Sequence, residues 1–255
     1  MSERAKLRST TGAGTHEGRV RDHNEDSWFA AEEQGLWAVA DGMGGHEGGE
    51  WASAVVVDQL RELGLAGAFD ECCEQIAEAI HAANRLIFAE ALKRGKQMGT
   101  TAVILFVRAR RFAVLWVGDS RAYLLRDGVL HQISKDHTQI QEMLDRGLLD
   151  PSEAEKHPMR HILARAVGVT EAMEVDVIVD DIEAGDTFLL SSDGLHCCVG
   201  QNDIRSILGG SSPDVIATKL VEMSLDHGAP DNVTVVAVRF REATLLDVTQ
   251  SADSQ

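Results

Sequence analysis

The stretch that decides the fold runs from residue 102 to residue 133 and reads AVILFVRARRFAVLWVGDSRAYLLRDGVLHQI. Valine, leucine, isoleucine and aromatic residues fill it, and Arg, Gly and Asp interrupt it at short intervals, a composition typical of successive β-strands. Four strands are predicted, at Ala102–Arg108, Phe112–Val117, Ala122–Leu125 and Val129–Ile133. Asp127-Gly128 is a typical hairpin turn. We therefore expect an antiparallel meander without intervening helices.

Further strands and helices lie on both sides of this meander. Strand-like runs occur at Gly35–Ala40, Val175–Val179, Thr187–Ser191 and Val233–Phe240. Apolar residues recur with helical spacing in Gly49–Leu63, Glu71–Lys93 and Ser212–Asp226, the last with Ser212 as the expected N-cap. Because strands follow one another through the centre of the chain, the pattern predicts an α+β fold of antiparallel sheets covered by helices, not a doubly wound parallel sheet.

Composition places the chain among soluble, acidic proteins. Its 255 residues allow one large domain or two small ones, and no Pro- or Ser-rich linker divides them. With 24 Lys and Arg against 41 Asp and Glu, the formal net charge is −17, which argues against nucleic acid or an anionic membrane as a partner. We expect a cytoplasmic protein, since Met1–Thr15 lacks the apolar core of a secretory signal. Its adjacent cysteine pairs, Cys72-Cys73 and Cys197-Cys198, are expected to be buried, reduced thiols, with Cys73 on an apolar helical face.

Carboxylates stand where the predicted strands end or begin. The acids concerned are Asp41, Asp119, Asp193 and Asp231, with Asn24-Glu25-Asp26 upstream of them. One Asp-Gly at a strand end is usually only a turn, but four such acids in one chain predict a cluster of oxygen ligands. Without cations, clustered carboxylates would repel one another and raise each other's pKa. An oxygen-only set without Cys or His favours Mg²⁺ or Mn²⁺ over zinc or copper.

Six short motifs carry these acids and follow one another along the chain. They are Arg21-Asp22-His23-Asn24-Glu25-Asp26-Ser27, Asp41-Gly42-Met43-Gly44-Gly45, Met98-Gly99-Thr100-Thr101, Val117-Gly118-Asp119-Ser120-Arg121, Ser191-Ser192-Asp193-Gly194-Leu195 and Pro230-Asp231-Asn232-Val233-Thr234. In this order they resemble the motif set of the metal-dependent serine/threonine protein phosphatases of type 2C, and the compact bacterial members most closely. The resemblance covers nearly the whole chain, residues 11–240.

The resemblance implies a fold as well as a metal centre. It implies a four-layer α-β-β-α sandwich, in which two central antiparallel sheets are flanked by helices. Residues 1–241 would form a single catalytic domain with a variable flap at 135–167, and residues 242–255 a polar, disordered tail. Two tightly bound Mn²⁺ or Mg²⁺ ions would lie at one end of the sandwich, with a third, weaker site beside them.

The resemblance also implies a role for each site residue. The metal ligands would be Asp41, which bridges two ions, the backbone carbonyl of Gly42, Asp193 and Asp231, with Asp119 sharing the third ion with Asp193. Glu25 and Asp26 would hold metal-bound waters, and Arg21 would grip the substrate phosphate. Arginine suits this work because its planar guanidinium binds phosphate in bidentate fashion.

The expected chemistry is in-line attack on phosphorus by a bridging hydroxide, because two divalent cations lower the pKa of a shared water from ~15.7 towards ~7. One departure from the family pattern concerns the proton donor. Animal members carry a His directly after the Asp-Gly dipeptide, where this chain has Met43. His46, His137, His161 and a metal-bound water therefore stay open as the general acid.

The function implied is hydrolysis of phosphoserine and phosphothreonine on proteins by a monomer, opposing a eukaryotic-type Ser/Thr kinase in bacterial signalling. Two other functions stay open. One is a non-catalytic scaffold that binds a phosphoprotein, and the other is a hydrolase of small phosphate esters. The presence of all four core aspartates, Asp41, Asp119, Asp193 and Asp231, argues against the scaffold.

Overall fold

The computed structural model of the chain describes residues 7–45, 47–154, 157–160 and 162–243. The predicted tail at 242–255 lies outside these residues except for its first two positions. Within the described part, no helix combines the length and the apolar character needed to span a membrane.

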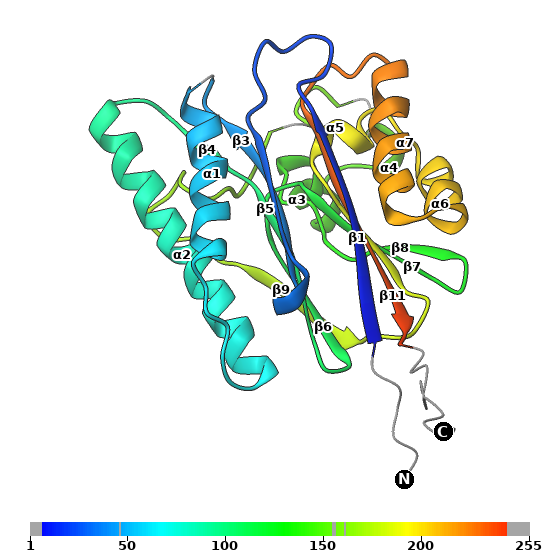
Figure 1. Cartoon of the computed structure of the whole chain (residues 1–255). Coiled ribbons are helices and arrows are strands. Elements are labelled where there is room, and N and C mark those ends of the chain that lie inside the picture. The colour runs from blue at the N-terminus through cyan, green and yellow to red at the C-terminus, as the bar shows by residue number, and fades with distance from the viewer. Residues whose placement is uncertain (1–6, 46, 155–156, 161, 244–255) are drawn as a thin grey trace, which may run out of the picture.

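Two antiparallel sheets form the centre of the molecule (Figure 1). The first has the strand order β1-β11-β10-β7-β8, with β1 at Leu7–His16, β7 at Arg121–Arg126, β8 at Val129–Gln132, β10 at Thr187–Ser191 and β11 at Val233–Glu242. The second has the order β2-β3-β5-β6-β9, with β2 at Asp26–Ala31, β3 at Leu36–Met43, β5 at Ala102–Arg108, β6 at Arg111–Val117 and β9 at Asp176–Asp181. The short β4, Gly99–Thr100, pairs with the end of β3.

Helices cover the outer face of each sheet (Figure 1). The helices of the described residues are α1 Glu47–Arg61, α2 Phe69–Arg94, α3 Gln139–Asp145, α4 Pro151–Ala154, α5 Asp193–His196, α6 Gln201–Gly210 and α7 Pro213–Asp226, with a 3-10 turn at Glu32–Gln34. The α1 and α2 helices pack on the second sheet, and α5 to α7 pack on the first. Ser212 is the N-cap residue of α7 as predicted, although its side chain makes no capping hydrogen bond.

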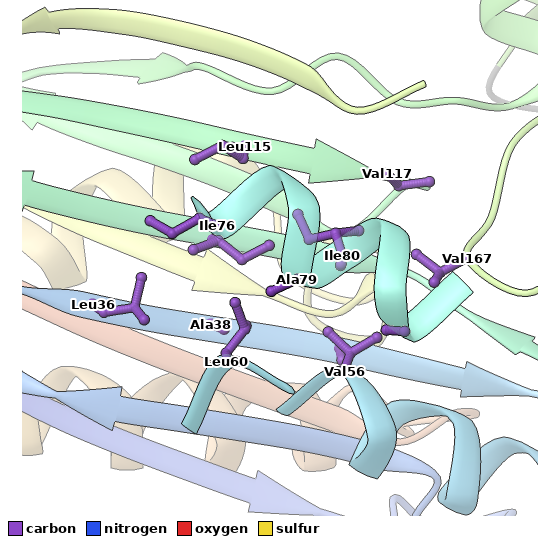
Figure 2. Close-up of a cluster of buried hydrophobic side chains, with 14 of the residues drawn as sticks. Leu36, Ala38, Val56, Leu60, Ile76, Ala79, Ile80, Leu115, Val117 and Val167 are labelled. Carbon is purple, nitrogen blue, oxygen red and sulfur yellow. The ribbon is translucent and has the colours of Figure 1, made fainter. Parts of the chain in front are cut away.

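Three apolar clusters join the two sheets and the helices on their outer faces. One lies between the second sheet and its helices (Figure 2), one between the sheets, and one between the first sheet and its helices. Strand β3 contributes to two of them, because Leu36 and Ala38 face the helices whereas Trp37 and Val39 face the other sheet. The prediction of a four-layer α-β-β-α sandwich is confirmed.

The predicted meander at residues 102–133 is wrong in one respect. Its strands form two hairpins that belong to different sheets, β5-β6 in the second and β7-β8 in the first. The Asp127-Gly128 turn between β7 and β8 is confirmed, with φ of 50° and 75°. The chain crosses from sheet to sheet between β6 and β7, beside Asp119. Strands buried on both faces carry no alternating polar pattern, so the sequence does not reveal the change of sheet.

Strands β1 and β2 were not predicted, because neither has a strongly apolar run. The β1 residues are small or polar, and they pair with β11 over ten positions from Leu7 to His16. Gly12 shows why a small residue is needed in this strand, since a Cβ at this position would lie 2.2 Å from the carbonyl carbon of Pro213. Helix α7 therefore packs directly on the backbone of this edge strand.

Phe188 tests the layer between the sheets. Its ring is fully buried and packs edge-on against Phe112 and Phe240, with ring centroids 4.9 and 5.9 Å away. Phe188→Ala should lower the free energy of unfolding by about 3–5 kcal/mol in urea denaturation, because it leaves a cavity in a close-packed layer. Val129→Ala, at an exposed position of β8, is the control and should cost less than about 0.5 kcal/mol. Equal losses for the two variants would contradict the assignment of Phe188 to the core.

Candidate metal centre

A cavity of about 1230 Å³ gathers the predicted site residues from distant parts of the chain. It lies where β3, β6 and β10 end and β11 begins. The predicted residues that line it are Arg21, Glu25, Asp41, Gly42, Asp119, Asp193 and Asp231. Asp26 does not line the cavity, but its Oδ1 atom is buried and its carboxylate interacts electrostatically with Asp193 and Asp231.

The antiparallel pairing of the strands explains this convergence. Asp41 lies at the end of β3 and Asp26 at the start of β2, and the two are direct partners in the ladder. The end of β10 is held in the same way beside the start of β11, which places Asp193 close to Asp231. Because the end of one antiparallel strand meets the start of its neighbour, acids far apart in sequence meet at one edge.

Burial of these acids changes their charge state. It raises the pKa of Asp26 to about 7, of Asp119 to about 8 and of Asp193 to about 6, and neighbouring carboxylates add to each increase. Burial also raises the pKa of Asp41 well above its usual range, with Asp26 and Asp193 as the leading repulsive neighbours. Several negative charges therefore repel one another in a space shielded from water.

Arg21 is a cation in the lining of the cavity that pairs with one of the predicted acids. Its Nη2 donates a hydrogen bond of 2.7 Å to Oδ2 of Asp231, and its side chain is 55% exposed. The hydrogen bond with Asp231 and the charge of that carboxylate raise the pKa of Arg21 further, so the guanidinium stays charged. Arg21 thus lies at the open side of the cavity, while the acids lie deeper.

The donor set fits hard divalent cations. Carboxylates supply oxygen atoms only, and Oδ1 of Asp26 is buried without a hydrogen-bond partner among the described residues. Within the same residues, no three His, Cys, Asp or Glu side chains close around one point in a metal-holding geometry. Two of the acids instead make contacts with other protein groups. Asp231 accepts a hydrogen bond from Arg21 at 2.7 Å, and Oδ2 of Asp26 accepts one from Ser192 at 2.8 Å.

Gly42 allows two backbone segments to meet at the cavity. A Cβ at this position would lie 2.1 Å from the carbonyl oxygen of Gly49 and 2.6 Å from that of Glu25. The Gly42 amide donates to the Glu25 carbonyl at 3.1 Å. Any other residue would separate the end of β3 from the loop that carries Glu25, which explains glycine at this point of the Asp41-Gly42 motif.

Asn232 is a site residue to which the sequence reasoning gave no role. Its Oδ1 accepts from the amide of Glu25 at 2.8 Å, and its Nδ2 donates to the carbonyls of Glu17 and His23 at 2.9 and 2.8 Å. One buried side chain therefore fixes the loop that carries Arg21 to the segment that carries Asp231. In the sequence, this role is indicated only by the position of Asn232 between Asp231 and the apolar run that begins at Val233.

The described part of the predicted flap contributes to the wall of the cavity. Arg160, Ile162 and the run from Leu163 to Ala166 line the cavity. His137, a candidate proton donor, does not line it. Its Nδ1 accepts from the Gly118 amide at 3.1 Å and its ring stacks on Trp116, so it holds the flap to the Asp119 connection.

The other two histidines considered for proton donation, His46 and His161, lie outside the described residues. Met43, which replaces the histidine of animal members, lines the cavity.

The cysteines depart from the expectation of buried thiols. All four are free, but only Cys72 is buried. Cys72 lies within the apolar layer between α2 and the second sheet, and Cys73 is half-buried against this layer. Cys197 is exposed and lines the cavity, with its Sγ 3.3 Å from that of Cys198.

Comparisons with known proteins agree with this geometry. A family model described as "Protein phosphatase 2C" matches residues 13–207. The serine/threonine protein phosphatase PstP of Mycobacterium tuberculosis is 39% identical over 226 residues, which are 88% of this chain and 43% of that protein. The serine/threonine phosphatase stp of Listeria monocytogenes is 35% identical over 238 residues, covering 88% of this chain and 93% of the relative. The chain thus spans less than half the length of the first of these relatives.

Solved structures give the same result. PppA, described as a key regulatory component of T6SS in Pseudomonas aeruginosa, superposes with a TM-score of 0.86 at 38% identity, over 92% of this chain and 100% of that one. The catalytic domain of PstP in complex with two manganese ions superposes with a TM-score of 0.84 at 36% identity, over 93% and 100%.

The raised pKa values predict how stability changes with pH. In EDTA, the folded protein keeps protons on these acids that the unfolded chain releases above about pH 4. The melting temperature should therefore fall as the pH rises from about 5 to 8, through the pKa values near 6, 7 and 8 of Asp193, Asp26 and Asp119. Asp26→Asn should melt several degrees above the wild type at pH 8 and close to it at pH 5. Thermal unfolding followed by circular dichroism checks this, and a wild-type melting temperature that rises over the same range would contradict it.

Proposed function

This chain belongs to the protein phosphatase 2C family, and we propose that it hydrolyses phosphoserine and phosphothreonine on proteins with the help of Mn²⁺ or Mg²⁺. The observation that carries the proposal is the buried group of carboxylates with raised pKa values, which opens onto a cavity with Arg21 at its exposed side. The relative solved with two manganese ions supports the choice of cation.

The proposed ligands are Asp41, the Gly42 carbonyl, Asp193 and Asp231 for two tightly bound ions, and Asp119 with Asp193 for a third, weaker one. Glu25 and Asp26 would orient water around them. When bound, the ions supply Lewis-acid stabilisation of the phosphoryl oxygens and lower the pKa of water towards neutrality. The protein contributes rigid placement, because these acids sit at the ends of paired strands or beside them.

Arg21 would bind and orient the substrate phosphate. Its guanidinium is exposed enough to meet a ligand, and its present partner is a carboxylate that presents similar oxygen acceptors. A phosphate dianion can therefore take one face of the guanidinium, while Asn232 keeps the loop that carries Arg21 in place. A phosphate bound in this way would lie beside the acidic end of the cavity.

The proposal extends to the setting of the reaction. The substrate would be a protein phosphorylated by a eukaryotic-type Ser/Thr kinase. The names of the relatives, which are serine/threonine phosphatases, support the phosphorylated residue type. Four free cysteines support a reducing, cytoplasmic location. A net charge of −17 on each copy opposes self-association and supports a monomer. A scaffold that binds phosphoproteins without turnover is the alternative, and activity measurements separate the two.

Asp193→Asn tests the ligand assignment. It should reduce Mn²⁺-dependent hydrolysis of p-nitrophenyl phosphate by roughly 100-fold or more, because it removes a charged ligand shared by two proposed ion sites. Asp203→Asn, at an exposed acid on α6, is the matched control and should keep wild-type activity. If Asp193→Asn retained most of its turnover while folding normally, the assignment would be wrong.

Arg21→Ala tests the phosphate contact. It should raise the KM for a phosphothreonine peptide by about tenfold and change kcat less, because the guanidinium would hold the phosphate already in the ground state. The KM of Arg21→Lys should lie between those of the wild type and Arg21→Ala, since lysine keeps the positive charge but cannot bind the phosphate in bidentate fashion. Steady-state kinetics in Mn²⁺ measure both constants. A loss confined to kcat would show that the contact forms only in the transition state.

A further inference from the structure

Strand β9 is an exposed apolar edge that the catalytic site does not use. It pairs with β6 and is the last strand of its sheet among the described residues. Val177, Ile178 and Val179 are 52%, 40% and 42% exposed, in a strand that reads Asp-Val-Ile-Val-Asp-Asp. Consecutive exposed β-branched residues at a sheet edge invite the addition of another strand.

The backbone of β9 presents free hydrogen-bonding groups along this edge. The Ile182 amide donates to the Arg110 carbonyl at 3.0 Å, and an antiparallel ladder alternates, so Ile178 and Asp180 also direct their backbone groups to β6. The groups of Val177 and Val179 point outward. The outward amide of Asp181 is already satisfied by the Asp180 side chain at 2.8 Å. Two successive outward positions are therefore available to an added strand.

Charge decides which kind of strand can bind. Exposed Asp180 and Asp181 lie at one end of β9, and Glu174 with Asp176 lies at the other. Arg165 pairs with Asp176 at 2.6 Å and with Glu174 at 4.0 Å, so four acids and one arginine leave an excess of negative charge at the ends of the strand. Antiparallel self-pairing centred on Ile178 would place Asp176 opposite Asp180 twice, between copies that each carry a charge of −17. Like charges in direct opposition destabilise a strand pair. A segment with an apolar centre flanked by Lys or Arg matches this edge, and a second copy of the chain does not.

The edge also continues the wall of the catalytic cavity. Val169, Thr170, Ala172, Met173 and Glu174 line that cavity, and β9 begins two residues after the last of them. An extended chain whose phosphorylated residue enters the cavity therefore has a strand edge beside its path.

We propose that β9 docks an extended segment of the phosphoprotein substrate by strand addition, and that it selects segments with an apolar centre and basic flanks. The proposal rests on the proposed phosphatase activity and names the substrate feature that this chain selects outside the phosphorylated residue. The main-chain bonds of Val177 and Val179 supply affinity, and the acids at the two ends of the strand supply the charge preference.

The test uses phosphothreonine peptides and the full chain in Mn²⁺. One peptide carries a flexible Gly-Ser linker followed by Lys-Val-Thr-Val-Lys, a second carries Glu-Val-Thr-Val-Glu instead, and a third ends after the linker. Each extension is placed in turn before and after the phosphothreonine. The basic extension on at least one side should lower KM by about tenfold relative to the peptide without it, and the acidic one should not. Equal KM values for all peptides would overturn the proposal.

Two variants of one residue separate backbone docking from other effects. Val179→Pro removes an outward N–H that the fold does not use, which an edge strand tolerates, whereas Val179→Thr keeps it. Val179→Pro should return the KM of the basic peptide to that of the unextended one, and Val179→Thr should retain most of the preference. If the two variants behaved alike, strand addition would be excluded.

Val177→Lys changes the charge of the edge at an exposed side chain and does not depend on how well Val179→Pro folds. It should raise the KM of the basic peptide and lower the KM of the acidic one. Hydrolysis of p-nitrophenyl phosphate should be unchanged in Val179→Thr and Val177→Lys, because this small ester has no chain to dock. If the wild type hydrolyses p-nitrophenyl phosphate but shows no preference among the peptides, the docking proposal is wrong and the proposed function stands. An inactive wild type would refute the proposed function.

Discussion

The mutual repulsion of buried carboxylates is the constraint on which the rest of the structure depends. Burial is the main cause of the raised pKa values of Asp26, Asp41, Asp119 and Asp193 at the end of the sandwich, and the charges of neighbouring carboxylates add to it. Keeping them there destabilises the folded chain at neutral pH. Three close-packed apolar layers offset this cost, because the two inner sheets are buried on both faces. Stability is thus concentrated in the sheets, and the repulsion is confined to their edge.

Strand pairing turns this constraint into a site. A one-residue slip of the edge strand β2 along β3 would separate Asp26 from Asp41. It would also turn Phe29 away from the helices and Ala30 away from the layer between the sheets. The register that buries the apolar residues is therefore the register that assembles the acids. Asn232 adds the remaining link, since its side chain fixes the loop of Arg21 and Glu25 against the start of β11.

The sequence predicted the acids and most core strands because both have local signals. Asp41 and Asp193 follow apolar runs, and α2 and α7 show helical periodicity near their observed bounds. The division of the central strands between two sheets could not be predicted, because β5 to β7 are buried on both faces. The pairing of β1 with β11 and the role of Asn232 depend on contacts more than 200 positions apart, which no local pattern encodes. The resemblance to type 2C phosphatases supplied what periodicity could not.

The central claim is that Asp41, Asp193 and Asp231 hold divalent cations at this edge of the sheets. The most direct measurement is anomalous scattering at the manganese absorption edge from crystals of this chain grown with MnCl₂. The account predicts two strong anomalous peaks within coordination distance of these three carboxylates, with Arg21 turned towards the open side of the cavity. Carboxylates that stay apart with no anomalous peak between them, in crystals that contain the ion, would contradict it.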